Sequence, residues 1–295
     1  MTVDTTAEAR SVLAYPTKPP TYASGLRQSN LRAVARGRWV AEQHFAYELS
    51  NDPMTILMSL KSTDPLGTAV LMPAADGNGE FELVRCRSIA EQTEFYRRSR
   101  NVSSIVEAKV FGSFGSDWYG LVDGVLTSRN VTTGADTLLD FVGLMPTARD
   151  EDTSIAEIGF GRLYSEGRDL EADLAWRGRA LHSRQQRLAR LQAGDLGGLA
   201  ALYAPNATVV AKAPRSSEQI TLVGRDEIAS YYGSVLADLG GSPAVDLLVS
   251  HIHGWFSFTE FVWESEDATY RSADVSNIGA DGLIAYELGY ACDQH

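Results

Sequence analysis

The chain repeats its own pattern, and this internal repeat constrains its fold more than any other feature. Residues 36–38 and 177–179 both consist of Arg-Gly-Arg at the start of a helical pattern. Further along each half, residues 88–96 and 224–232 are both typical of a capped helix that ends in an aromatic pair. A chain of 295 residues that repeats in this way is expected to hold two copies of one structural unit.

Each half follows the order helix, helix, strand and short helix, and then has four segments rich in β-forming residues. These are 105–115, 118–130, 137–144 and 154–164 in the first half, and 245–253, 255–264, 269–278 and 283–290 in the second. Helices combined with a run of antiparallel strands predict an α+β fold, because the helices gather on one face of the sheet. We therefore expect two tandem cone-shaped domains, each a curved antiparallel sheet with helices packed on one face.

Three regions follow from this division of the chain. We expect an extended, proline-bearing arm over residues 1–28, a first domain over 29–166 and a second domain over 167–295. No long linker separates the two domains, so we expect them to pack on each other as an intrachain pseudo-dimer. Further homo-oligomerisation stays open.

Charge and cysteine content limit the partners and the compartment. Acidic residues outnumber basic residues 38 to 26, and the net charge of −12 repels phosphate backbones and anionic lipid headgroups. No apolar run approaches the roughly 20 residues that span a bilayer, and the first residues lack the apolar core of a secretory signal. The two cysteines, Cys86 and Cys292, form neither a metal-ligand cluster nor a disulfide framework. We expect a cytoplasmic protein without nucleic-acid or membrane partners.

Two segments of the second half resemble a known superfamily. Residues 193–209 (AGDLGGLAALYAPNATV) and 274–284 (DVSNIGADGLI) resemble the nuclear transport factor 2-like superfamily, in particular ketosteroid isomerases and SnoaL-like polyketide cyclases. The resemblance covers roughly residues 179–291, and residues 31–164 join it through the internal repeat. It implies a cystatin-like, cone-shaped fold. The superfamily includes isomerases, dehydratases, cyclases, epoxide hydrolases and non-catalytic binders, so the fold does not settle the activity.

The resemblance to ketosteroid isomerases implies a protonated aspartic acid on the penultimate strand. Asp274 falls on this position, and Asp140 matches it in the first half. An acidic residue between apolar strand neighbours must be paired or protonated if it is buried. Both are therefore candidate catalytic residues, and the alternative is an outward-facing or arginine-paired aspartate.

The same resemblance implies a tyrosine on the long helix, and this chain departs from it. In the first half the position holds His44, and Tyr47 lies one turn away on the same helix face. This pair is a candidate donor pair, with a hydrogen-bonded interfacial histidine as the alternative. In the second half the position holds Arg187, in a stripe with Arg184 and Arg190 that favours a solvated face. A pocket pair of Arg187 with Asp274 is the alternative there.

No carboxylate stands where the isomerases place their base, either after Thr208 or in residues 69–72. The replacement candidates are His251 and His253, which are two residues apart in a strand and so project from one face. Imidazole suits proton transfer near pH 7. Two histidines can also bind a metal, but no third ligand stands at useful spacing, so no metal is expected. The alternative is a strand end with both rings exposed.

Aromatic residues supply the candidate substrate-binding side chains and favour a flat apolar ligand over a sugar or a nucleotide. The candidates are Tyr203, Tyr232, Trp255, Trp263, Tyr96 and Trp118.

These features together predict a cofactor-independent acid–base enzyme, a lyase or isomerase of the cyclase, dehydratase or isomerase type. Its substrate is expected to be a small hydrophobic carbonyl or hydroxy compound, such as a polyketide or a steroid- or terpenoid-like metabolite. His251 or His253 would remove a proton and Asp274 would polarise the substrate oxygen, with a second site around His44, Tyr47 and Asp140. The main alternative is a non-catalytic small-molecule-binding or scaffold protein, and an epoxide hydrolase ranks last.

Overall fold

The computed structural model describes most of the chain. The described residues are 28–60, 67–73, 81–148, 152–163, 170–213, 216, 218–241, 243–253, 256–266 and 269–292. The arm expected over residues 1–28 lies outside them, except for Gln28, at which the first described helix begins.

The first half forms one six-stranded sheet with three helices. Its elements are α2 (Gln28–Glu48), α3 (Pro53–Leu57), β1 (Thr68–Pro73), β2 (Phe81–Cys86), α4 (Ile89–Val102), β3 (Ser103–Gly115), β4 (Tyr119–Asn130), β5 (Asp136–Pro146) and β6 (Ile158–Leu163). The strand order is β2-β1-β6-β5-β4-β3. All neighbours are antiparallel except β1 and β6, which run parallel.

The second half repeats this plan element by element. Its elements are α5 (Leu170–Ala193), α6 (Leu196–Ala200), β7 (Tyr203–Lys212), β8 (Gln219–Val223), α7 (Arg225–Asp238), β9 (Ala244–His253), β10 (Phe256–Glu264), β11 (Thr269–Ile278) and β12 (Ile284–Ala291). The order β8-β7-β12-β11-β10-β9 is that of the first sheet, with β7 and β12 parallel. The predicted tandem α+β architecture is confirmed.

Two details differ from the expectation. The sheets are mixed rather than wholly antiparallel, because the first and last long strands of each half pair in parallel. Each sheet also carries an additional edge strand, β2 or β8. Most residues of both edge strands are partly or fully exposed, so they lack the apolar alternation that marks a strand in a sequence.

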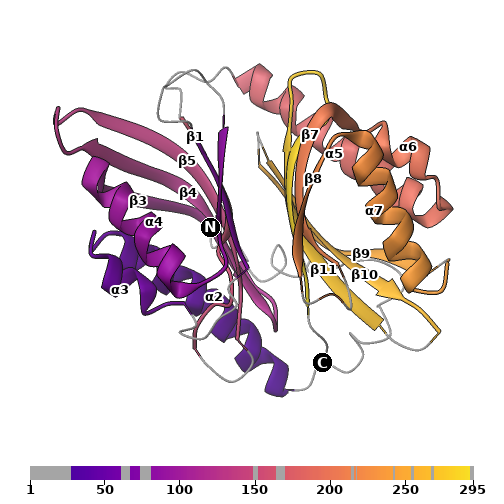
Figure 1. The fold of residues 1–295 in the computed structure, drawn as a ribbon, viewed down its shortest axis with the longest axis horizontal. Coiled ribbons are helices and arrows are strands. Elements are labelled where there is room, and N and C mark those ends of the chain that lie inside the picture. The colour runs from indigo at the N-terminus through magenta and orange to yellow at the C-terminus, as the bar shows by residue number, and fades with distance from the viewer. Residues whose placement is uncertain are drawn as a thin grey trace, which may run out of the picture.

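The two sheets lie face to face at the centre of the molecule, and each carries its helices on its outer face (Figure 1). One apolar cluster joins them, with Leu121 and Val142 from the first half and Phe258 and Val275 from the second. The layers therefore run helices, sheet, sheet, helices. This arrangement confirms the expected intrachain pseudo-dimer.

A buried carboxylate ties the two halves together at this interface. Glu260 on β10 is fully buried and accepts hydrogen bonds from Trp118 Nε1 at 3.0 Å and from Tyr119 Oη at 2.9 Å. Arg271 Nε donates to the same carboxylate at 2.7 Å. Burial raises the pKa of Glu260, and the charge of Arg271 opposes this shift. Trp118, a candidate substrate-binding residue, thus lies between the halves.

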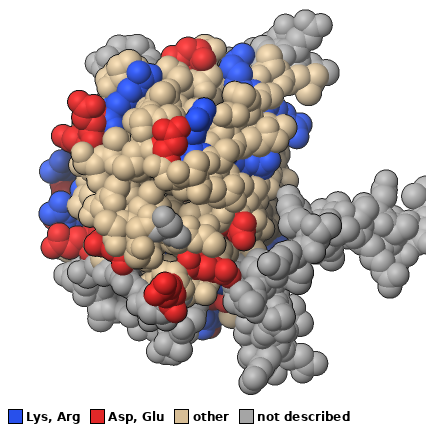
Figure 2. Space-filling model, turned by 90° about the vertical axis from the view of Figure 1, so that its right-hand side faces the viewer, with Lys and Arg blue, Asp and Glu red and all other residues tan. Residues whose placement is uncertain are grey.

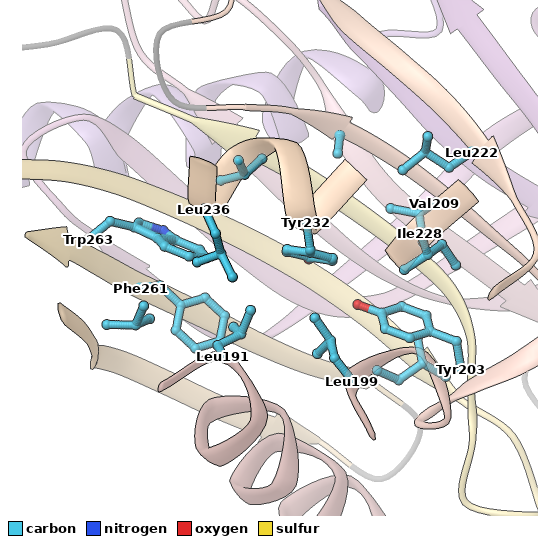
Figure 3. Close-up of a cluster of buried hydrophobic side chains, with 14 of the residues drawn as sticks. Leu191, Leu199, Tyr203, Val209, Leu222, Ile228, Tyr232, Leu236, Phe261 and Trp263 are labelled. Carbon is cyan, nitrogen blue, oxygen red and sulfur yellow. The ribbon is translucent and has the colours of Figure 1, made fainter. Parts of the chain in front are cut away.

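A second core fills the space between the second sheet and its helices. Figure 3 shows Leu191 of α5, Leu199 of α6 and Leu236 of α7 directed toward Phe261 and Tyr203 on the strands.

On the face of the molecule in Figure 2, Lys and Arg side chains appear among Asp and Glu side chains. Within the described residues, no helix has both the length and the apolar character needed to cross a bilayer.

Candidate active site

Each half brings a basic side chain, a tyrosine and a glutamate together beneath its helices. The basic residue comes from the long helix, the tyrosine from the helix after the second strand, and the glutamate from the last strand or the residue before it. The two sets are His44, Tyr96 and Glu157 in the first half, and Arg187, Tyr232 and Glu287 in the second.

An aspartate caps the start of the short helix that follows the long helix in both halves. Asp52 Oδ2 accepts a hydrogen bond from the Thr55 amide at 3.0 Å, and Asp195 Oδ1 accepts one from the Gly198 amide at 2.8 Å. Such a side chain satisfies an amide that the first helical turn leaves without a partner. The two halves therefore share the same capped turn between the long helix and the short helix.

In the first half, hydrogen bonds fix the orientation of the His44 ring. The Ser59 hydroxyl donates to the Ile56 carbonyl at 2.7 Å and lies 2.7 Å from His44 Nδ1, so it accepts the proton of Nδ1. The other ring nitrogen, Nε2, lies 3.2 Å from Tyr96 Oη. His44 is only 2% exposed.

Glu157 is the acceptor at the centre of this cluster. Its Oε2 accepts hydrogen bonds from Tyr96 Oη at 2.6 Å and from Gln92 Nε2 at 3.0 Å, while its Oε1 lies 3.5 Å from His44 Nε2. Burial on its own raises the pKa of Glu157, but the charge of His44 and these hydrogen bonds outweigh burial and lower it. Burial, followed by the charge of Glu157, raises the pKa of Tyr96 well above its usual value. The carboxylate of Glu157 is therefore held ionised, and the Tyr96 hydroxyl is held neutral and donates to it.

A second carboxylate flanks His44. Glu48 lies one helical turn after His44, with its Oε1 3.7 Å from His44 Nε2. Its other oxygen, Oε2, forms an ion pair with Arg100 of α4. Both side chains of this pair are only 10% exposed.

A cavity of about 100 Å³ opens beside these groups. His44, Glu48, Tyr96, Arg100 and Glu157 line its polar end. The rest of the wall is mainly apolar and includes Phe45, Val70, Phe95, Leu126, Phe141 and Phe160. A cavity of roughly 150 Å³ accommodates benzene, so this space fits a ligand of about one small ring or a short chain.

In the second half, more hydrogen bonds join the members of the corresponding cluster to one another than in the first half. Arg187 Nη1 donates to Asp274 Oδ1 at 2.9 Å, and its Nη2 donates to Glu287 at 2.9 Å and to Tyr232 Oη at 2.6 Å. Tyr203 Oη also donates to Glu287, at 2.8 Å. Arg187 is 4% exposed, so the interpretation of its stripe as a solvated face is wrong for this residue. The alternative pair with Asp274 is confirmed.

Asp274 and Asp140 lie on opposite faces of their respective sheets. Asp274 pairs across the strands with Thr259 and lies on the helix-covered face with Phe261. Asp140 is next to Phe141, which lines the cavity, so its side chain points to the other face, where Arg162 Nε donates to it at 3.0 Å. The structure therefore does not bring Asp140 to His44.

His251 faces the interface between the two sheets rather than Asp274. Its strand partner is Phe258, and its ring lies against Phe114 of the first half with centroids 5.7 Å apart. Its Nε2 is 3.6 Å from Asp123 Oδ2. His251 and Asp274 thus stand on opposite faces of one sheet and do not form the predicted pair.

The remaining candidates are distributed over three places. Tyr96 lines the first-half cavity, whereas Tyr47 is only packed against the neighbouring apolar cluster. Tyr203 and Tyr232 belong to the Arg187 network, and Trp263 Nε1 donates to Ser272 Oγ at 2.8 Å. Trp255 and the side chain of His253 lie outside the described residues.

Glu157 was missed, although its sequence context carried a signal. It stands between Ala156 and Ile158 in an apolar segment that enters a strand. This is the same criterion that singled out Asp274. Glu48 and Ser59 carry no comparable signal, because acidic and hydroxyl residues near a helix end are common.

Comparison with known proteins yields solved structures only. No family model and no curated protein matches the chain. The similar structures include a nuclear transport factor 2-like protein of unknown function from Burkholderia xenovorans, with 17% identity and a TM-score of 0.34 over 40% of this chain and 86% of that chain. A SnoaL-like protein of unknown function from Burkholderia thailandensis has 14% identity and a TM-score of 0.32 over 40% of this chain and 95% of that one. A protein provisionally named a ketosteroid isomerase, from Kribbella flavida, has 14% identity and a TM-score of 0.33 over 40% and 81%.

These structures carry the superfamily names to which residues 193–209 had pointed. At such identities and TM-scores they carry no functional information for this chain. The chemistry has to follow from the site itself.

Proposed function

We propose that the first half is an acid–base enzyme for a small hydrophobic carbonyl or hydroxy compound. The observation that supports this most is the trio His44, Tyr96 and Glu157 at the polar end of an otherwise mainly apolar cavity. Apolar walls bind the carbon skeleton, and a few convergent polar groups act on one functional group. The proposal moves the reaction from the second half, where the sequence had suggested it, to the first.

In this proposal Glu157 is the general base and Tyr96 the oxyanion donor. The lowered pKa of Glu157 keeps its carboxylate ionised at neutral pH, so it can take a proton from a carbon next to the substrate carbonyl. The electron pair of the broken C–H bond passes to the carbonyl oxygen. The Tyr96 hydroxyl then donates its hydrogen bond to that oxygen instead of to Glu157. Glu157 Oε2 retains the hydrogen bond from Gln92.

The size of the cavity narrows the substrate class. The described cavity of about 100 Å³ lies below the roughly 300–1,000 Å³ typical of sites for drug-sized ligands. A compound with one small ring or a short chain therefore fits better than a steroid. Isomerases, dehydratases and cyclases of such compounds can all begin with this proton transfer, and we place the reaction among lyases or isomerases.

Deuterium exchange tests the proposal without knowledge of the natural substrate. The full-length protein is incubated in D₂O with small cyclic ketones such as cyclopentanone, and deuterium uptake at the α-carbon is followed by NMR. We expect the protein to accelerate uptake and Glu157→Gln to reduce the acceleration by about 10²–10⁴-fold. Tyr96→Phe should also reduce it, whereas Asp246→Asn, at an exposed site on β9, should not.

Two outcomes would contradict the proposal. Loss of exchange in Asp274→Asn together with normal exchange in Glu157→Gln would move the chemistry to the second half. Ketone binding in the cavity without any exchange would favour the second candidate, a small-molecule-binding protein. The hydrogen bonds that His44, Tyr96 and Glu157 already make to one another are compatible with that candidate.

A further inference from the structure

Three potential metal-ligating atoms converge at the polar end of the first-half cavity. They are His44 Nε2, Glu48 Oε1 and Glu157 Oε1, with separations of 3.7 Å and 3.5 Å from Nε2 to the two oxygens. Ligand atoms of these three residues all lie within 4.8 Å of one another. Ligands about 2.1 Å from a tetrahedral metal stand about 3.4 Å apart, so the two shorter separations are those of a metal site.

The remaining polar atoms of the three side chains form hydrogen bonds or an ion pair with other residues. Ser59 accepts the proton of His44 Nδ1, and Arg100 pairs with Glu48 Oε2. Tyr96 and Gln92 both donate to Glu157 Oε2. Hydrogen bonds of this kind fix the tautomer and the orientation of metal ligands. Here they turn one lone pair and two carboxylate oxygens toward a single point.

The space between these three atoms requires a positively charged group. Two carboxylate oxygens and an imidazole lone pair repel one another in a buried site unless a cation lies between them. One solution is a proton on Nε2. The other is a metal ion, whose two charges, together with Arg100, outweigh the charges of Glu48 and Glu157.

We propose that His44, Glu48 and Glu157 bind one divalent transition-metal ion. Mixed nitrogen and oxygen ligands favour Zn²⁺ or a similar ion over Ca²⁺ and Mg²⁺, which prefer oxygen alone. Three protein ligands leave the fourth position of a tetrahedral ion directed to the cavity that the same residues line. An ion on Glu157 Oε1 would occupy the oxygen that the proposed function uses as base, so metal binding is a separate property of this cluster and does not rest on the proposed function.

Metal titration of the full-length protein tests this inference. Zn²⁺ is titrated calorimetrically into protein stripped with a chelator, and Co²⁺ is added separately to record the visible absorption of a tetrahedral site. We expect one equivalent of each metal ion to bind. His44→Ala and Glu157→Gln should each weaken binding at least tenfold.

Two further variants keep the test decisive. Ser59→Ala leaves all three ligands in place and should weaken binding about 10–100-fold, because it releases the ring orientation. His182→Ala removes an exposed histidine from α5 and should leave binding unchanged. Thermal melts of the metal-free variants show whether each is folded.

Equal Zn²⁺ affinity in the wild type, His44→Ala and Glu157→Gln would overturn the inference, as would the absence of Zn²⁺ binding by the wild type at pH 8. Deuterium exchange by the metal-free protein is a separate readout. If exchange persists without metal binding, the inference fails and the proposed function stands. If Zn²⁺ binds as expected without exchange, the proposed function fails and the metal site stands.

Discussion

A single residue position distinguishes the two halves. His44 and Arg187 occupy equivalent positions before the aspartate cap, and each contacts a tyrosine and lies near a glutamate. Imidazole can gain and lose a proton near pH 7, whereas guanidinium stays charged. Arg187 is therefore suited to hold acidic groups in place, and His44 to take part in proton transfer or metal binding.

The raised pKa of Asp274 predicts how the free energy of unfolding depends on pH. Burial, opposed by the charge of Arg187, raises the pKa of Asp274 from 3.8 to about 7. The folded state then holds a proton that the unfolded state releases, so the contribution of this group is complete below about pH 4 and declines as the pH rises to about 7. In urea unfolding between pH 4 and pH 8, Asp274→Asn should show a shallower fall in the free energy of unfolding than the wild type.

Asp246→Asn, at an exposed aspartate of β9, serves as the matched control and should retain the wild-type slope. Identical slopes in Asp274→Asn and the wild type would mean that Asp274 is ionised throughout this range.

The sequence could identify some of these residues and not others. An acidic residue among apolar strand neighbours is visible in the sequence, both at Asp274 and at Glu157. The contact between His44 and Glu157 could not be predicted, because the two residues are far apart in the chain and meet only when β6 pairs with β1. Spacing rules for metal ligands find neighbours in sequence and miss such a site.

At the scale of elements, the two Arg-Gly-Arg motifs have different surroundings. A Cβ atom on Gly37 would lie 2.3 Å from the carbonyl oxygen of Tyr119, because α2 crosses β4 at this point. A Cβ atom on Gly178 in α5 would meet nothing within 4 Å. The first glycine is thus required for the close approach of the helix that carries His44, and the second is not.

This difference predicts opposite effects of one substitution. Gly37→Ala should lower the free energy of unfolding and weaken the cavity site, because α2 must move away from backbone atoms. Gly178→Ala should raise that free energy by up to about 1 kcal/mol, since alanine is the better helix former. Urea unfolding of both variants measures the effects, and a stabilised Gly37→Ala would contradict the close approach of α2 to β4.

The positions of the long strands were easier to predict than the sheet face to which each side chain points. The eight long segments were found because their apolar residues recur at strand spacing, while β2 and β8 were missed because they are short and half-exposed. The match of Asp140 with Asp274 placed the two aspartates at equivalent positions. In the register of the two sheets, however, Asp274 corresponds to Gly143, which lies three residues from Asp140. An odd shift along a strand reverses the face of the side chain, and this separates the two aspartates.

At the scale of the whole molecule, the halves share a buried interface and should unfold together. Apolar residues of both sheets form one cluster, and Glu260 accepts hydrogen bonds across it from Trp118 and Tyr119. Calorimetry of the wild type should therefore show a single transition. Glu260→Ala would leave Arg271 and both donors without this acceptor, and should cost about 3–5 kcal/mol. Two separate transitions in the wild type would contradict the coupling of the halves.

The internal repeat was sufficient to predict the tandem architecture and the packing of the halves. It could not show which half has the described cavity, because the resemblance in residues 193–209 lies in the second half. The structure locates the described cavity in the first half, whereas the corresponding cluster in the second half is closed by hydrogen bonds of Arg187, Asp274 and Tyr203.

The proposed function requires a ligand to bind beside His44, Tyr96 and Glu157. The most direct test is a crystal structure of the full-length protein soaked with cyclopentanone. We predict the ketone in the first-half cavity, with its oxygen about 2.6–3.2 Å from Tyr96 Oη and its α-carbon beside Glu157 Oε1. Ketone bound next to Arg187 and absent from the first-half cavity would contradict this account.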